Sequence, residues 1–298
     1  MKPALIIGST CVDVILNIHH LPRTEENLRP SAQQLSLGGC AYNVSHIVRL
    51  LNAPHTFISP VGGGVYGDYV ARQLAAEGIP LTVTLPDQEN GCCYCLVEAT
   101  GERTFMSYHG AEYTFQKEWM TPYPAAGYGL TYICGLEIEE PTGENLIQYL
   151  EENPTLQVFY APGPRVNRIG REKNDRLLAL KPILHINEGE AIGWSGKATY
   201  QEAAAYFHSI TGNTVIITLG EAGAFCISPD GKAFLAPSQP VKQVVDTIGA
   251  GDSHAGAIIA CLTMDMPLEQ AVAYANRVAA AVVGTRGGRL PAQSLPAL

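Results

Sequence analysis

Basic side chains are scarce in this sequence, and long apolar runs are absent. The 298 residues carry 19 Lys and Arg against 28 Asp and Glu, a net charge of −9, and no stretch gathers the basic residues into a stripe. Binding to a nucleic-acid backbone needs such a stripe, and a membrane span needs about 18 consecutive apolar residues. We therefore expect neither a nucleic acid nor a membrane among the partners of the protein.

Cysteine usage and the N-terminus both bear on the compartment. Of eight cysteines, Cys92 and Cys95 form one CxxC, but no second pair and no His pair lies at zinc spacing. We therefore expect structural, reduced thiols. The N-terminal ALIIG predicts a buried first strand rather than a signal segment, because Gly8, Cys11 and Asp13 interrupt the apolar stretch. These features predict a cytoplasmic protein.

The sequence also lacks GxxxxGK[ST], which excludes a P-loop as a phosphate cradle. A glycine-rich turn at residues 62–68, GGGVYGD, satisfies GxGxxG between a predicted strand at 55–61 and a predicted helix, with Asp87 twenty residues past Gly67. That pattern occurs in dinucleotide-binding sites. Against this interpretation, Pro60 disturbs the strand end and the unit is not the first of the chain. An NAD-dependent oxidoreductase remains an alternative.

One stretch, VVDTIGAGDSHAGAII at residues 244–259, has the pattern of a strand, a tight glycine turn and a helix from Ser253 onward. The first turn of a helix has unpaired N–H groups and partial positive charge, and glycine at 249 and 251 lets an anion approach the backbone. Asp252 would repel that anion unless it faces a hydroxyl beside it, as a phosphoryl-transfer site requires. An ordinary turn with an Asp cap fits equally well.

Predicted strands and helices alternate along the whole chain, which indicates an α/β fold with a mostly parallel central sheet flanked by helices on both faces. Two strand-rich segments do not fit the alternation. One lies at about 13–37, and the other, at 91–110, contains a predicted hairpin. We expect one domain, residues 1–298, to which these segments add a small β-sheet.

Three motifs together resemble the ribokinase-like (PfkB) family of carbohydrate kinases. They are DTxGAGD at 246–252, GGxxxN at 38–43 and a VG…GD turn at 61–68. The resemblance covers nearly the whole chain. It implies a ribokinase-like fold in which the small sheet is a lid, and ATP-dependent phosphorylation of a primary hydroxyl of a sugar or nucleoside.

The resemblance also implies roles for individual residues. Asp252 resembles the catalytic base, and Gly249, Ala250 and Gly251 resemble the anion hole for the transferring phosphate. Glu137 follows a strand where members often contact the sugar, although a solvated carboxylate is an equal alternative. Donors and acceptors held in fixed positions suit the recognition of a sugar, because its hydroxyls would be costly to leave without hydrogen bonds. The positions that usually hold sugar hydroxyls are Asp13, Gly38, Gly39 and Asn43.

For the nucleotide, the resemblance implies binding of ATP. Thr218, Gly220 and Gly223 resemble the T-x-G-x-x-G nucleotide loop, and Asn276 resembles a position beside the adenine.

Two metal sites are implied as well. Asn187 and Glu190 match the N-x-x-E element, which acts on Mg²⁺ through water, and oxygen donors suit that ion. Asp246 and Ile248, with the backbone of residues 286–288, correspond to a site for the K⁺-like monovalent cation that many members use.

Several positions depart from the family pattern. Cys11 and Cys40 replace an asparagine and a lysine of ribokinases proper, which weakens ribose as the substrate. His254 stands where an aromatic residue is common, and it is either a packed helix residue or a ligand contact. Arg165 follows an element that lacks its usual acid, and it remains a candidate phosphate contact.

The resemblance leaves the acceptor open, because relatives use ribose-like sugars, ketohexoses, pseudouridine and purine nucleosides. It also implies a homodimer formed through the lid. A catalytically silent sugar- or nucleotide-sensing protein is a further alternative, which the intact GAGD turn at residues 249–252 argues against.

Overall fold

The computed structural model describes residues 2–241, 243–285 and 289–298. The chain forms two compact units. The first contains residues 1–7, 43–58 and 115–298, and the second contains residues 8–42 and 59–114. Each unit is described separately below.

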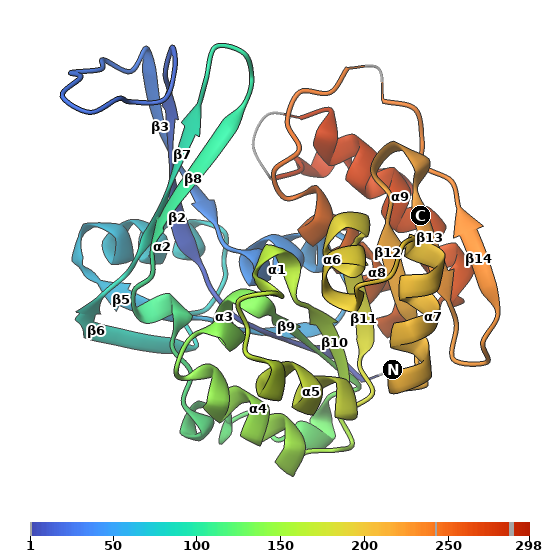
Figure 1. Ribbon diagram of the computed structural model, residues 1–298. Helices are drawn as coiled ribbons and strands as arrows, with labels where there is room; N and C mark the ends of the chain where they lie inside the picture. Colours follow the sequence, from blue (N-terminus) through green and yellow to red (C-terminus); the bar gives the residue numbers. More distant parts are fainter. Residues whose placement is uncertain (1, 242, 286–288) are drawn as a thin grey trace. The chain divides into compact units, whose positions relative to one another are not determined.

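An eight-stranded sheet organises the first unit, in the order β14-β13-β12-β11-β10-β9-β1-β4 (Figure 1). Neighbouring strands in the β12-β11-β10-β9-β1-β4 part of this order are parallel. The strands β13 and β14 are antiparallel to their neighbours. Central strands such as β1 and β9 are buried along their whole length, as parallel strands covered on both faces must be. The strands are β1 Ala4–Ile7, β4 His55–Ile58, β9 Leu130–Cys134, β10 Gln157–Ala161, β11 Ile183–Asn187, β12 Val215–Thr218, β13 Ala224–Ile227 and β14 Ala233–Ala236.

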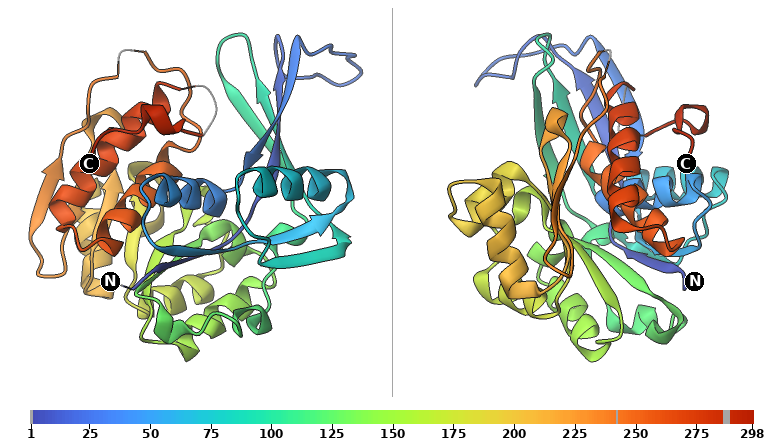
Figure 2. Two further views of the ribbon diagram at one scale, coloured as in Figure 1. Left: turned by 180° about the vertical axis from the view of Figure 1, so that it is seen from behind. Right: turned by 90° about the vertical axis from the view of Figure 1, so that its right-hand side faces the viewer.

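Helices cover both faces of this sheet, so the predicted fold class is confirmed. Figure 2 shows α6 and α7 on one side of the β12–β14 end and α8 and α9 on the other. The helices are α1 Cys40–Leu50, which begins in the second unit, α3 Gly135–Glu139, α4 Gly143–Glu152, α5 Arg171–Ala179, α6 Glu188–Ser195, α7 Tyr200–Thr211, α8 Ala250–Thr263 and α9 Leu268–Val283. Short 3-10 turns lie at η2 Lys117–Met120, η3 Ala125–Gly127, η4 Gly163–Arg165, η5 Gly220–Ala222 and η6 Ala292–Ser294.

The second unit contains the small separate sheet that the sequence predicted. Its four strands have the order β3-β2-β7-β8, and β7 and β8 form the expected hairpin. A two-stranded sheet of β5 and β6 and the helix α2 complete the unit. The elements are β2 Cys11–Asn17, β3 Ala32–Gly38, β5 Pro60–Gly63, α2 Gly64–Ala76, β6 Val83–Glu89, β7 Cys92–Val97, β8 Arg103–Tyr108 and the 3-10 turn η1 Ala111–Tyr113.

The single strand predicted at 55–61 is wrong, because the chain passes from one sheet to another at this point. β4 ends at Ile58 in the first unit, and β5 pairs with β6 in the second. The glycines of the GxGxxG pattern are explained by packing, since a Cβ on Gly67 would lie 2.0 Å from the carbonyl oxygen of Gly62. Asp87 lies in β6. This arrangement argues against a dinucleotide site here.

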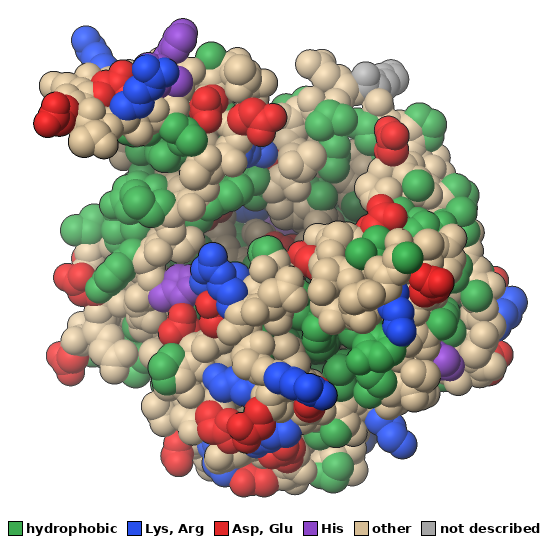
Figure 3. Space-filling model, viewed as in Figure 1, with side chains coloured by type: hydrophobic (Ala, Val, Ile, Leu, Met, Phe, Trp, Pro, Cys, Tyr) green, Lys and Arg blue, Asp and Glu red, His purple; other side chains and the backbone are tan. Residues whose placement is uncertain are grey.

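The surface and the helices carry two further observations. On the face shown in Figure 3, Lys and Arg side chains are scattered among Asp and Glu. Within the described residues, no helix combines the length and the apolar character that crossing a membrane requires.

Candidate active site

Helix α8 begins three residues earlier than the sequence indicated, and residues 243–249 before it form no strand. The backbone N–H groups of Val245 and Asp246 both donate to the carbonyl of Val283, at 2.9 and 3.1 Å. The segment before the glycine turn is thus held by the C-terminal end of α9. Gly249 is the N-cap residue, with a φ of 70° that favours glycine.

The first turn of α8 has the properties of an anion site. The N–H of Ala250 donates to the carbonyl of Thr247 at 3.3 Å and that of Ser253 donates to the carbonyl of Gly249 at 2.8 Å. The dipole of this 14-residue helix adds positive charge at the turn. A Cβ on Gly251 would meet no described atom within 4 Å apart from its own helix and chain neighbours. Packing therefore does not require glycine at this position, whereas the close approach of an anion does.

Asp252 lies in this turn, and its carboxylate accepts a hydrogen bond from Asn43. The distance from Asn43 Nδ2 to Asp252 Oδ2 is 2.9 Å. Helices α1 and α8, which carry these two residues, approach each other closely one turn beyond Asp252. There a Cβ on Gly256 would lie 2.7 Å from the carbonyl oxygen of Val44 and 3.0 Å from Ile47 Cβ. The small residue at 256 therefore brings Asn43 and Asp252 within hydrogen-bonding distance.

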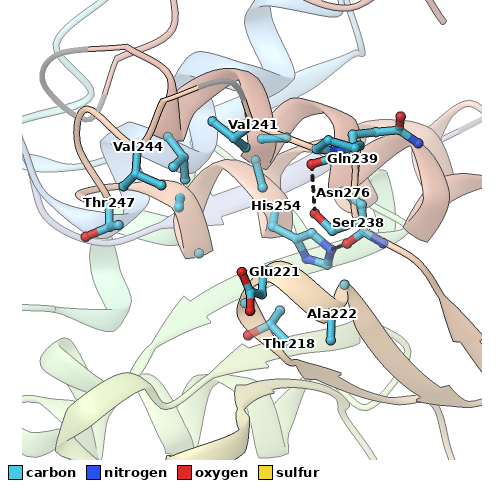
Figure 4. Close-up of a pocket in the computed structure, with 18 residues that line it drawn as sticks. Thr218, Glu221, Ala222, Ser238, Gln239, Val241, Val244, Thr247, His254 and Asn276 are labelled. Carbon is cyan, nitrogen blue, oxygen red and sulfur yellow. Dashed lines mark hydrogen bonds between the residues drawn. The ribbon is translucent and has the colours of Figure 1, made fainter.

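A cavity of about 840 Å³ lies beside this turn (Figure 4). It brings together six of the residues to which the family resemblance gives a role, which come from the end of β12, the β12–β13 loop, the α8 turn and helix α9. Gly223 is required by the loop itself, since its φ is 101° and a Cβ would lie 2.1 Å from the carbonyl oxygen of Ala236. The six residues are Thr218, Gly220, Gly223, Ala250, Gly251 and Asn276.

The apolar wall of the cavity was not predicted. Helix α9 presents Asn276, Ala279, Ala280 and Val283 to it, a spacing that places them on one helix face. This spacing was readable in the sequence once Asn276 had been chosen. Another part of the wall, which includes Val241 and Val244 (Figure 4), comes from an irregular segment that gave no signal.

A buried hydrogen-bond chain fixes the amide of Asn276 at the cavity. Asn276 Nδ2 donates to the carbonyls of Ala236 and Pro237, at 2.9 and 3.2 Å. Its Oδ1 must then accept from His254 Nε2, at 3.0 Å. His254 Nδ1 in turn accepts from His185 Nε2, at 2.8 Å. These tautomers follow from the amide donors.

Both histidines of this hydrogen-bond series, His185 and His254, are held in the neutral form. Burial lowers the pKa of His254 to about 4, and burial with the neighbouring His254 lowers the pKa of His185 well below its ordinary value. His254 is 2% exposed and also lines the cavity. It is therefore a packed helix residue, as one of the two alternatives predicted, and its ring also reaches the cavity wall.

Three further candidate residues lie together in the second unit. A Cβ on Gly38 would lie 2.3 Å from Asp13 Oδ2, and Gly39 has a φ of 103° with the Ser9 carbonyl oxygen 2.5 Å from its ideal Cβ position. Glycine at 38 thus lets the chain pass beside the Asp13 carboxylate, and glycine at 39 is required by the local backbone conformation and the nearby Ser9 carbonyl.

The sheet face that carries Asp13 also carries a pair of thiols, Cys93 and Cys95, which the sequence did not reveal as a cluster. Cys95 Sγ donates to Cys93 Sγ at 3.9 Å, and Ser107 Oγ donates to Cys93 Sγ at 3.4 Å. The hydrogen bond from Cys95, with that from Ser107, lowers the pKa of Cys93 to about 6. All eight cysteines of the chain are free.

Comparison with known proteins decides the family. The family model described as "pfkB family carbohydrate kinase" matches residues 1–295. The chain belongs to the pfkB family of carbohydrate kinases. It is 34% identical to the uncharacterized sugar kinase YegV of Escherichia coli (strain K12), over 96% of this chain and 90% of that protein. The predicted class, a sugar or nucleoside kinase, is confirmed.

Two solved structures show the same fold as this pfkB chain. A ribokinase of Thermotoga maritima has a TM-score of 0.84 at 21% identity and covers 100% of this chain and 97% of its own. An Arabidopsis thaliana ribokinase, complexed with ribose and ATP, has a TM-score of 0.80 at 20% identity and covers 99% and 97%. The ribokinase-like fold is thereby shown.

The pair that matches the pfkB N-x-x-E element forms a capping box at the start of α6. Asn187 Oδ1 accepts from the N–H of Glu190 at 2.8 Å, and Glu190 Oε2 accepts from the N–H of Asn187 at 3.2 Å. Burial raises the pKa of Glu190. A partly buried carboxylate held by a backbone N–H fits a hard cation, since it is oriented before the ion arrives.

The candidate monovalent-cation site is described only in part. Asp246 is buried, and its Oδ1 accepts from the N–H of Ile248 at 2.8 Å. The third contributor, the backbone of residues 286–288, lies outside the described residues. The buried carboxylate beside the glycine turn fits a cation, because burial of an anion favours a charged partner.

The remaining two candidates of the pfkB pattern lie around helix α3. Glu137 is 3% exposed, so the alternative of a solvated carboxylate is wrong. Arg165 Nε pairs with Glu139 Oε2, so its guanidinium already has an anionic partner.

Proposed function

We propose that this protein transfers the γ-phosphoryl group of ATP to a primary hydroxyl of a sugar or nucleoside, with Asp252 as the catalytic base. One observation supports this proposal above the others. Asp252 is oriented by Asn43 in the same helix turn whose Ala250 and Gly251 line the cavity. A base and an anion site in one turn suit phosphoryl transfer to an alcohol.

In this mechanism Asp252 accepts the proton of the attacking hydroxyl. The N–H groups at Gly249, Ala250 and Gly251 stabilise the negative charge that develops on the transferring group. The cavity takes ATP, with its adenine against the apolar face of α9 near Asn276 and its phosphates between the Gly220 loop and the α8 turn. The cavity volume suits a ligand of this size.

Asn187 and Glu190 are the residues that would hold Mg²⁺ through water, and Asp246 and Ile248 are those that would hold a K⁺-like cation. When bound, Mg²⁺ supplies charge neutralisation on the phosphates. The capping box supplies preorientation of the Glu190 carboxylate.

The second unit is proposed to bind the acceptor and to act as the lid. Asp13, Gly38 and Gly39 are the proposed contacts with sugar hydroxyls, together with Asn43 and Glu137. The glycine backbone that passes beside Asp13 supports this assignment, because it leaves no side chain between the carboxylate and a ligand. We further propose a homodimer formed through this unit and, given eight free thiols, a cytoplasmic location.

A panel of sugars and nucleosides assayed for ADP release tests the proposal. At least one acceptor should be phosphorylated, and Asp252→Asn should lose most turnover, by about 10³-fold or more for a lost general base with its anchored hydroxyl, while ATP binding by calorimetry stays nearly unchanged.

Asp265→Asn is the matched control. It changes an exposed acid just beyond α8 whose φ of 60° asparagine tolerates. Near-normal turnover in Asp252→Asn would refute the assignment of the base. ATP binding without transfer to any acceptor would favour the sensing protein instead.

A further inference from the structure

One face of the four-stranded sheet in the second unit carries a carboxylate and two thiols in close proximity. Asp13, Cys93 and Cys95 each offer one ligand atom, and these atoms lie within 4.8 Å of one another. Cys95 is buried, and Asp13 and Cys93 are half-buried. The kinase mechanism proposed above uses Asp13 but neither thiol.

Strand register explains why these side chains meet. β2 and β7 are parallel neighbours, with Asp13 opposite Cys93 and Ile15 opposite Cys95. Because side chains alternate across a strand, residues 93 and 95 share one face and residues 92 and 94 share the other. On that other face Tyr94 bonds to Tyr66 of α2, at 3.1 Å between the hydroxyl oxygens. The thiol pair therefore points away from α2.

The spacing of the sulfurs fits a tetrahedral metal ion. With Zn–S bonds of about 2.3 Å, two sulfurs of a tetrahedral site lie about 3.8 Å apart. The observed distance between Cys93 Sγ and Cys95 Sγ is 3.9 Å. The pair is thus already spaced as two ligands of one ion.

The donor set selects the class of ion. Two thiolates and one carboxylate oxygen suit Zn²⁺ and other thiophilic cations, whereas Mg²⁺ and K⁺ prefer oxygen donors alone. Three protein ligands leave the fourth position of a tetrahedral ion to water. Binding converts the thiols into thiolates and releases their protons to solvent.

We propose that Asp13, Cys93 and Cys95 form a binding site for a thiophilic divalent cation of the Zn²⁺ class, and that the bound ion withdraws Asp13 from the acceptor. The withdrawal of Asp13 from the acceptor, unlike the metal site itself, rests on the proposed role of Asp13 in the kinase. The ion would then act as an inhibitor that competes with the sugar or nucleoside.

Equilibrium dialysis of the reduced full-length protein against Zn²⁺ alone tests the site. One equivalent should bind, and Cys93→Ser and Cys95→Ser should each weaken binding by at least 10- to 100-fold, roughly the loss that changes in outer-shell partners cause. Co²⁺ as a probe should show thiolate-to-metal charge-transfer absorption that both variants lose. Asp13→Asn should retain that absorption with reduced affinity.

Cys92→Ser is the matched control, because residue 92 is adjacent in sequence but faces the opposite side of the sheet. Its Zn²⁺ affinity should equal that of the parent. Failure of Zn²⁺ to bind, or equal binding by the parent and Cys93→Ser, would overturn the site.

The competition is tested with the acceptor found by the panel. Zn²⁺ should raise the KM for the acceptor in the parent and in Cys92→Ser but not in Cys93→Ser, and an unchanged KM in the parent would overturn the competition. Dialysis needs no turnover, so a failed metal site and a failed kinase assignment give different results.

Discussion

Asn43 Nδ2 donates to Asp252 Oδ2 at 2.9 Å, across 209 positions of sequence. The bond joins the two strongest motifs of the chain, the start of α1 and the start of α8. The amide donor on one oxygen fixes the orientation of this carboxylate, which is the proposed proton acceptor. Asn43 thus has a defined structural role besides the acceptor contact that the family resemblance implies.

Replacing Asn43 should therefore impair turnover. We expect Asn43→Ala to lower kcat by about 10- to 100-fold, because hydrogen bonds to charged groups contribute about 1.5–3 kcal/mol. In Asn43→Asp a second carboxylate opposes ionisation of Asp252, so the acidic limb of the pH–rate profile should move to higher pH. Steady-state kinetics across pH measures both.

Asn52→Gly is the control for these variants. Asn52 is exposed and follows α1, the helix that carries Asn43. Its φ is 54°, which glycine adopts easily. Its kinetics should match those of the parent. An unchanged kcat in Asn43→Ala would show that the bond does not orient the base.

Gly256→Ala should destabilise the protein and reduce turnover together. Its Cβ would lie 2.7 Å from the carbonyl oxygen of Val44, and a backbone atom cannot rotate away. Helices α1 and α8 must then separate, at a cost of about 1–3 kcal/mol. Thermal unfolding should show a lower Tm, and kcat should fall even well below that Tm because the Asn43–Asp252 bond lengthens.

The matched control is Gly193→Ala, inside α6. The nearest atom to its Cβ would be Asn167 Nδ2 at 3.6 Å, an ordinary contact. Alanine should leave stability unchanged or raise it by up to about 1 kcal/mol. If both variants behave alike, the close helix contact at Gly256 is not what positions the base.

His254 should affect the nucleotide and not the acceptor. In His254→Leu the Oδ1 atom of Asn276 loses its donor, and leaving a buried polar atom unsatisfied costs about 1–3 kcal/mol. The KM for ATP should rise by about 10-fold with little change in the KM for the acceptor. His254→Gln keeps a donor and should recover part of the loss, whereas equal effects on both substrates would contradict the positioning role.

The hydrogen-bonded pair His185 and His254 predicts a loss of stability in mild acid. Their pKa values are lowered in the folded state, so their contribution is complete above the ordinary histidine pKa of 6.5 and is lost as the pH falls from there toward the folded pKa of His254, about 4. As the pH falls, these histidines bind protons at a higher pH in the unfolded chain than in the folded one, which favours unfolding.

The slope should be at most about 1.4 kcal/mol per pH unit for each histidine. Urea unfolding between pH 7 and pH 5 measures it, and His185→Gln should reduce the slope. A parent protein whose stability is flat over that range would contradict the prediction.

Some elements were predictable because their signals are local. Helix α9, Leu268–Val283, is one of them, since its apolar residues repeat at helical spacing and Pro267 precedes it. The β7–β8 hairpin follows from strand alternation around a glycine turn. The strand at 55–61 was mispredicted because both halves are apolar, and only pairing with β6 separates β5 from β4.

The sequence by itself determined the α/β fold class, the kinase family and the residues of the GAGD turn, because these depend on periodicity and on motifs of consecutive residues. Tertiary structure alone decided which distant side chains meet. Packing at Gly256 places Asn43 against Asp252, a histidine chain fixes Asn276, and the β2–β7 register sets Cys93 and Cys95 beside Asp13. These contacts arise from the close approach of separate helices and strands, which no local pattern encodes.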